Sequence, residues 1–188
     1  MCFHNFEKKY YVADKPITCF KLMDRVGETP NGVLVNSVVY PRRMPYHVGD
    51  TISASSPSTP EAVNKLRNFN GEVVHSFSRD DISLYDEIAY LVLVRCEIPQ
   101  GETYWKDGDQ YASFSLVIKE VYDFKWSVEY ETYFGEYVHA NYPPTINLDE
   151  VRKDFLCQFE DGYNAKIFSM ASGYEWYRIE KVPFGIYD

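Results

Sequence analysis

Short runs of apolar and β-branched residues, separated by turn residues, recur along this chain, and this pattern is typical of β structure. The clearest example is the almost wholly apolar run at 90–97. A turn that contains Pro99 and Gly101 follows it, and further strand-like segments lie at 103–105 and 110–113. The remaining strands predicted by the same pattern lie at 17–23, 33–40, 72–77, 114–122, 128–134 and 174–182.

Three segments have the signals of helix starts. The stretch Ser58-Thr59-Pro60-Glu61 predicts a helix to about residue 69, because it combines a capping hydroxyl, a first-turn proline and a glutamate that can return the capping bond. A second helix is expected over 78–89, where apolar residues recur at helical spacing. A third begins at the capping box formed by Asn147 and Glu150.

The expected fold class is α+β. We predict a single, mainly β domain with a mixed or antiparallel sheet, two or three short helices and a C-terminal strand-helix-strand extension. A chain of 188 residues is long enough for one such domain. Because the composition changes after about residue 126, we expect a core domain at 1–125 and an extension at 126–188 that packs on it.

Aromatic residues make up 17% of the chain, with 17 Tyr and 12 Phe. These rings can have a structural role in the sheet and core or a functional role in binding. Aromatic side chains favour pleated, half-buried surfaces, so most of these rings are expected in strand faces and core. Tyrosine also combines a large apolar body with a polar tip. The composition therefore also allows an aromatic-rich binding face.

The net charge of -9 is unevenly distributed. Residues 1–70 contain 9 Lys and Arg against 6 Asp and Glu, a charge of +3, whereas residues 71–188 contain 10 against 22, a charge of -12. A chain this acidic lacks the basic surface that a long phosphate backbone requires, so we expect no binding of long nucleic acids.

Cysteine and histidine spacing gives no metal or redox motif. The cysteines at 2, 19, 96 and 157 and the histidines at 4, 47, 75 and 139 are too scattered for a metal site, so no metal, no cofactor and no catalytic group are assigned. The sequence shows no signal-peptide core and no apolar run of membrane-spanning length. We therefore expect a cytoplasmic protein without a membrane partner.

Two polar segments are candidates for ligand contact. In the predicted strand at 72–77, alternation places His75 on one face and Ser76 on the other, and the end of this strand could open into a cleft. The long loop at 42–60 is rich in Pro, Ser and Gly, and loops of this length are often functional. Its candidate ligand-binding residues are Arg42, Arg43, Tyr46 and His47. The alternative is structural: Ser78 caps the next helix, and His75 packs among aromatic rings.

The order of several short motifs resembles small, uncharacterised proteins that phages and prophages encode. These motifs are the strand at 17–21, the His75-Ser76-Phe77 strand, the segment at 96–101, Thr103-Tyr104 and Tyr111-Ala112-Ser113. The resemblance covers roughly residues 10–122 and identifies no active site. It implies a viral or mobile-element origin and action inside a bacterial cytoplasm.

A second resemblance is to the ADP-ribosyltransferase fold, in which Ser76-Phe77-Ser78 would correspond to the middle strand of the site. That fold uses an arginine on an early strand and a later catalytic glutamate. This chain has Lys21 at the first position and Gln110 near the second. Carboxylates that could replace the glutamate are Glu97, Glu102 and Glu120, and arginines that could meet phosphates are Arg42, Arg43 and Arg79.

Two functions follow as hypotheses. The first is a phage-type, non-enzymatic binding or interaction protein that sequesters or antagonises a host protein or a small nucleotide-like signalling molecule. The second is a nucleotide-handling enzyme that resembles the ADP-ribosyltransferases. The sequence does not identify the partner or the oligomeric state.

Overall fold

The computed structural model describes residues 9–38, 44–55, 59–66, 72–79, 91–131, 137–160 and 177–183. By compactness the chain divides into two units. The first comprises residues 1–80 and 90–123, and the second comprises residues 81–89 and 124–188.

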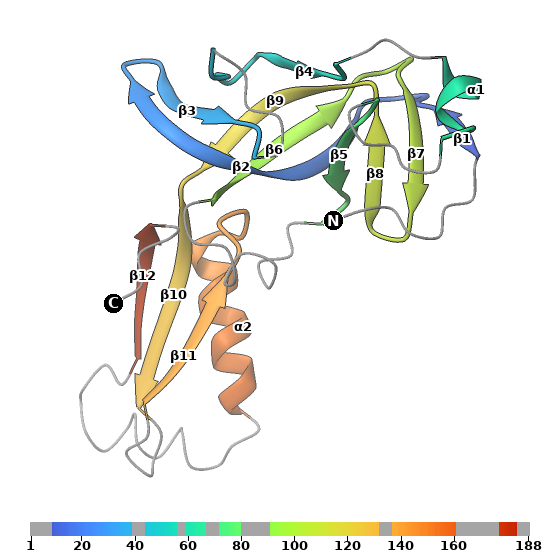
Figure 1. Ribbon diagram of the computed structural model, residues 1–188. Coiled ribbons are helices and arrows are strands. Elements are labelled where there is room, and N and C mark those ends of the chain that lie inside the picture. The colour runs from blue at the N-terminus through green and yellow to red at the C-terminus, as the bar shows by residue number, and fades with distance from the viewer. Residues whose placement is uncertain are drawn as a thin grey trace. The chain divides into compact units, whose positions relative to one another are not determined.

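The described residues of the first unit form a nine-stranded sheet in which every pairing is antiparallel. Its strands are β1 (Tyr10–Val12), β2 (Ile17–Thr29), β3 (Gly32–Asn36), β4 (Thr51–Ser53), β5 (Val74–Phe77), β6 (Leu91–Ile98), β7 (Thr103–Asp107), β8 (Gln110–Ser113) and β9 (Ser115–Tyr122). Their order is β1-β7-β8-β5-β2-β6-β9-β4, and β3 pairs with β2 outside this path. Figure 1 shows β2 as a long arc that crosses the unit.

Strands β2 and β6 form the centre of this sheet. Their register runs from the pair Ile17 and Ile98 to the pair Asp24 and Leu91. Further along, β2 shifts register against β3 at a bulge between Arg25 and Gly27, and a bulge of this kind bends a strand. The bend lets β2 pair with β5 and β6 at its start and with β3 at its end.

The two faces of the sheet bury different cores. The main core gathers on one face and includes buried residues from β2, β3, β4, β5, β6 and β9, such as Met23, Val94 and Ile118. The smaller cluster lies on the opposite face, where Val63 of the short helix α1 (Pro60–Val63) packs with Trp105 of β7. Trp105 is fully buried, and its indole N–H donates to the Asn64 side chain at 2.8 Å.

Two glycine turns connect β6, β7 and β8, and the last two of these strands carry Tyr104 and Tyr111. Gly101, with φ +83, lies in the turn from β6 to β7, and its N–H donates to the Ala13 carbonyl at 2.8 Å. This bond and the return bond from the Ala13 N–H to the Glu102 carbonyl hold the start of the chain against the turn. Gly108, with φ +54, supplies the left-handed residue of the tight β7–β8 hairpin.

The second unit contains a three-stranded antiparallel sheet and a helix. Its elements are β10 (Phe124–Glu131), β11 (Tyr137–Tyr142), α2 (Leu148–Glu160) and β12 (Tyr177–Pro183), with β10 in the middle of the sheet. Val128, Tyr142 and Val151 form its buried cluster, so one turn of α2 packs on the sheet. Asn147 and Glu150 exchange capping bonds of 3.0 and 3.3 Å, which confirms the predicted capping box.

The predicted fold class is confirmed: the protein is mainly β, with antiparallel sheets and two short helices among the described residues. Helix α1 is shorter than predicted, ending at Val63, and its cap is Thr59, whose hydroxyl accepts from the Ala62 N–H at 3.2 Å. Ser58 and the helix expected over 78–89 lie outside the described residues, except for 78 and 79. Strands β1, β4 and β11 were not predicted.

Candidate binding site

One face of the sheet presents a transverse row of polar and aromatic side chains, because directly opposed residues of antiparallel strands point to the same side. Tyr111 of β8 is opposite Ser76 of β5 and, on its other side, opposite Lys106 of β7. The pairing of Phe20 with Phe77 places Lys21 of β2 opposite Ser76. The row therefore runs Lys106, Tyr111, Ser76, Lys21, and we call it the central row.

Three tyrosines gather on the same face, and one of them, Tyr111, belongs to this row. Tyr11 of β1 is directly opposite Tyr104 of β7, with ring centroids 5.5 Å apart. The Tyr104 and Tyr111 rings meet edge to face at 5.9 Å. Tyr11 is 38% exposed, whereas Tyr104 and Tyr111 are partly buried against the main core. We call Tyr11, Tyr104 and Tyr111 together the tyrosine face.

Two lysines border the tyrosine face. The Lys9 ammonium lies 5.1 Å from the centroid of the Tyr11 ring, and the Lys106 ammonium lies 5.8 Å from that of Tyr111, so both are within cation–π range. Burial raises the pKa values of Tyr104 and Tyr111, and the charges of Asp14 and Asp109 add to this effect. Both phenols therefore keep their protons at neutral pH and can donate hydrogen bonds.

The central row ends at a partly buried lysine. The Lys21 ammonium donates to the His75 carbonyl at 2.9 Å. Burial lowers the pKa of Lys21, and the nearby Cys96 and Cys19 oppose that effect to a smaller degree. Among the described residues, no carboxylate lies within ion-pair distance of this ammonium. Lys21 thus lies on the core side of the sheet without a described counter-ion.

Two free thiols lie next to Lys21. Cys19 of β2 and Cys96 of β6 are directly opposite each other and fully buried. The pKa of Cys19 is raised to about 11, because the effect of burial exceeds the opposing effect of a hydrogen bond from the Ser76 hydroxyl to the ionised sulfur. Burial also raises the pKa of Cys96. The thiols are therefore neutral at pH 7, and the Ser76 hydroxyl, 1% exposed, has no other described partner.

His75 and Ser76 lie on opposite faces, as alternation predicts. His75 is opposite Ala112, so its side chain points to the face of the Trp105 cluster, and only its carbonyl contacts Lys21. Burial and, to a smaller degree, the charge of Lys21 lower the pKa of His75 to about 4. The imidazole is therefore neutral at physiological pH.

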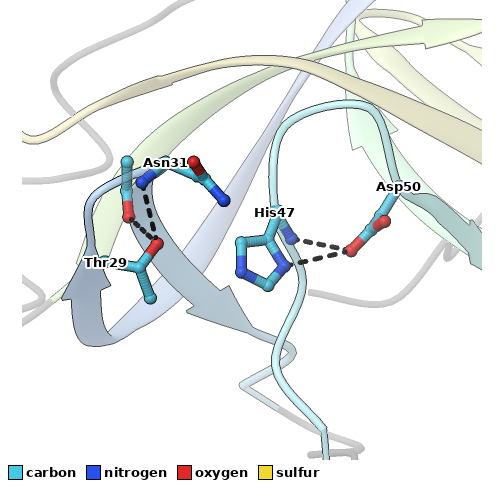
Figure 2. A network of polar contacts seen from close by, with 5 residues as sticks. Thr29, Asn31, His47 and Asp50 are labelled. Atoms are coloured by element: carbon cyan, nitrogen blue, oxygen red, sulfur yellow. Dashed lines mark hydrogen bonds and ion pairs between the residues drawn. The ribbon is translucent and has the colours of Figure 1, made fainter.

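Of the predicted loop residues, the structure describes Tyr46 and His47, and neither belongs to the strands of the central row. Tyr46 is 5% exposed in the main core, and its backbone forms a bridge with Val35 of β3. His47 is half exposed, and Figure 2 shows its backbone N–H and its ring both directed at Asp50. The Asp50 Oδ2 atom is 2.8 Å from the His47 backbone nitrogen and 3.6 Å from Nδ1. Arg42 and Arg43 lie outside the described residues.

Figure 2 also shows that Thr29 and Asn31 organise the neighbouring β2–β3 turn by local hydrogen bonds of 3.2 Å. The Asp50 loop itself is held to β9 by two backbone bonds, from Gly49 to the Ile118 carbonyl and from Ile118 to the Asp50 carbonyl. The hydrogen bonds of Asp50 and of its described neighbours in the loop therefore stabilise a turn and its attachment to the sheet.

The carboxylates considered for a transferase site lie away from Ser76. Glu97 binds Lys119 at 3.1 Å and Glu120 binds Arg95 at 3.0 Å, on the face of the sheet opposite Ser76. Glu102 accepts a hydrogen bond from the Ser115 hydroxyl. Gln110 is opposite Phe77 and shares its face. Outside the strand, Ser78 and Arg79 both contact Asp109, at 3.2 and 3.3 Å.

The sequence did not single out Tyr11, Lys21, Lys106 or the tyrosine face as a site. Its nearest signal is the pair of segments Thr103-Tyr104 and Tyr111-Ala112-Ser113, which form two strands joined by Gly108. A hairpin of that length brings Tyr104 and Tyr111 to one face. The pairing of β1 with β7, which adds Tyr11, joins residues more than ninety positions apart and has no local signal.

Comparisons with protein-family models, with curated proteins and with solved structures find no match for this chain. Within the described ranges, no group of three His, Cys, Asp or Glu side chains could hold a metal ion. Neither α1 nor α2, the helices of the described part, has the length and apolar run that a membrane crossing requires.

Proposed function

We propose that this protein is a non-enzymatic binding protein that holds a small planar anion of the nucleotide class on the tyrosine face. The observation that carries the proposal is the contact of Tyr11, Tyr104 and Tyr111 on one sheet face, with Lys9 and Lys106 over the outer rings. Aromatic rings on a sheet stack with nucleobases, at about 1–3 kcal/mol for each base. Border lysines attract negative charge.

The charge of the whole chain supports a small ligand over a polymer. At a net charge of -9, the protein repels a long polyanion, which binds by contacts with many phosphates. A mononucleotide or dinucleotide needs only one or two local cations. This proposal retains the expected partner class, a small nucleotide-like signalling molecule that a phage-type protein sequesters in the bacterial cytoplasm.

The test compares two neighbouring tyrosines of β1 that point to opposite faces. Tyr11 belongs to the tyrosine face, whereas Tyr10 contacts Trp105 and donates to Glu61 on the other face. Their exposures are 38% and 36%, so Tyr10→Ala is a matched control for Tyr11→Ala. Equilibrium dialysis with purine and pyrimidine 5′-monophosphates and NAD should show binding that Tyr11→Ala weakens by about tenfold and Tyr10→Ala leaves unchanged.

Two results would overturn the proposal. Equal loss in the two variants would remove the tyrosine face from the site, and the absence of binding to every member of the panel would remove the ligand class. Release of nicotinamide from NAD by the wild-type protein would favour the transferase hypothesis over a non-enzymatic role.

A further inference from the structure

Lys21 is the charged residue of the central row that the stacking role leaves unused. Its ammonium has three N–H donors, and one of them binds the His75 carbonyl. The titratable groups near it are Cys19 on its own strand, Cys96 on β6 and His75 on β5, whose side chain points to the other face of the sheet. All three are neutral at pH 7 because burial opposes their ionisation. A charge in such surroundings is costly unless an anion pairs with it.

Two basic residues of the nearby strands β6 and β9 differ from Lys21 because each has a carboxylate partner. Arg95 pairs with Glu120, and Lys119 pairs with Glu97, both on the opposite face of the sheet. Lys21 also keeps part of its surface open to solvent, unlike the fully buried Cys19 beside it. Burial dominates the environment of the ammonium itself, so an anion that pairs with it must also be removed from water.

We propose that Lys21 binds the anionic group of the ligand, a phosphate in a nucleotide, at the inner end of the tyrosine face. This inference rests on the proposed function. Lys21 shares the central row with Ser76, Tyr111 and Lys106, across three strand spacings of about 4.8 Å each. A ring in contact with the tyrosines and a phosphate at Lys21 fit within that span.

The pairing of the Lys21 ammonium with a phosphate determines how well the site distinguishes a nucleotide from its nucleoside. A lysine ammonium is a compact point charge that suits a phosphate oxygen, and its hydrogen bonds to charged groups contribute about 1.5–3 kcal/mol. A nucleoside offers the same ring without the charge. Lys21 should therefore set the preference for a nucleotide over its nucleoside, and the tyrosine face should set the affinity for the ring common to both.

The experiment measures the ratio of the nucleoside Kd to the 5′-monophosphate Kd by calorimetry. In the wild-type protein we expect a ratio of about ten or more. Lys21→Met should lower this ratio severalfold, to the part that Lys9 and Lys106 supply. Lys119→Met, which removes an equal charge from an ion pair on the other face, should leave it unchanged. Tyr11→Ala should weaken both ligands and preserve the ratio.

A measurement on the unmutated chain covers the case in which Lys21→Met does not fold. The protein is reductively methylated with ¹³C-formaldehyde, and the dimethyl-lysine signals are followed by NMR. Addition of the 5′-monophosphate should shift the Lys21 signal, and the nucleoside should not.

The outcomes separate this inference from the proposed function. Equal affinity of nucleoside and nucleotide, a ratio that Lys21→Met leaves intact, or a Lys21 signal that does not respond would overturn the role of Lys21 while stacking stands. No binding of either ligand by the wild-type protein would overturn both.

Discussion

The buried imidazole of His75 should make the stability of this protein fall in mild acid. Its pKa in the folded protein is about 4, against an ordinary value of 6.5, because burial and the charge of Lys21 oppose protonation. Between these two pH values, the unfolded chain binds a proton at His75 that the folded protein does not. Stability is therefore complete above pH 6.5 and decreases as the pH falls toward 4.

The size of the effect follows from the two pKa values. At about 1.4 kcal/mol for each pH unit, the difference between 6.5 and about 4 corresponds to at most about 3 kcal/mol of unfolding free energy lost by pH 4. His75→Gln keeps a polar side chain of similar length but cannot titrate. The variant should therefore lose less stability than the wild-type protein between pH 7 and pH 4.5.

Urea unfolding followed by tryptophan fluorescence measures this loss at several pH values. The relevant quantity is the difference between the two proteins, because carboxylates contribute equally to both. His47→Gln, which removes a half-exposed histidine, controls for the loss of a histidine elsewhere in the chain. If the wild-type protein and His75→Gln lose stability in parallel below pH 6.5, the account of the His75 environment is wrong.

Three further predictions concern the core and its cysteines. Trp105→Ala should lower the unfolding free energy by about 3–5 kcal/mol in urea titrations, because it empties the cluster on α1 and leaves Asn64 without the indole donor. Cys19 and Cys96 should resist a thiol reagent in the native protein and react after unfolding, as peptide mass spectrometry would show, since burial suppresses both thiolates. Lys21→Met should raise the thermal midpoint at pH 7 in the absence of ligand, because it removes a desolvated charge; a lower midpoint would contradict this.

Local sequence signals predicted the central strands and the capped helix of the second unit. The apolar run that became β6 and the Asn147 capping box depend only on neighbouring residues, so they could be read from the chain. Strands β1 and β4 have three residues each and exist because they pair with β7 and β9. No periodicity can appear in so short a segment.

The candidate site was harder to predict than the fold because it depends on register. Ser76 was identified from its own strand, but its neighbours Lys21 and Tyr111 come from β2 and β8, at sequence separations that give no local pattern. Tyr46 was expected at a contact face because it lies in a polar loop, and it lies in the core because its backbone pairs with Val35. Pairing across strands, rather than composition, decides which polar groups meet.

The most direct test of the tyrosine face is an NMR titration of the protein labelled at tyrosine ring carbons, with a purine 5′-monophosphate as the ligand. Binding at this face predicts that the signals of Tyr11, Tyr104 and Tyr111 shift together along one saturation curve, while that of Tyr10, on the opposite face, stays in place. Saturable binding that moves Tyr10 or other tyrosines and leaves these three unchanged would contradict the proposed site.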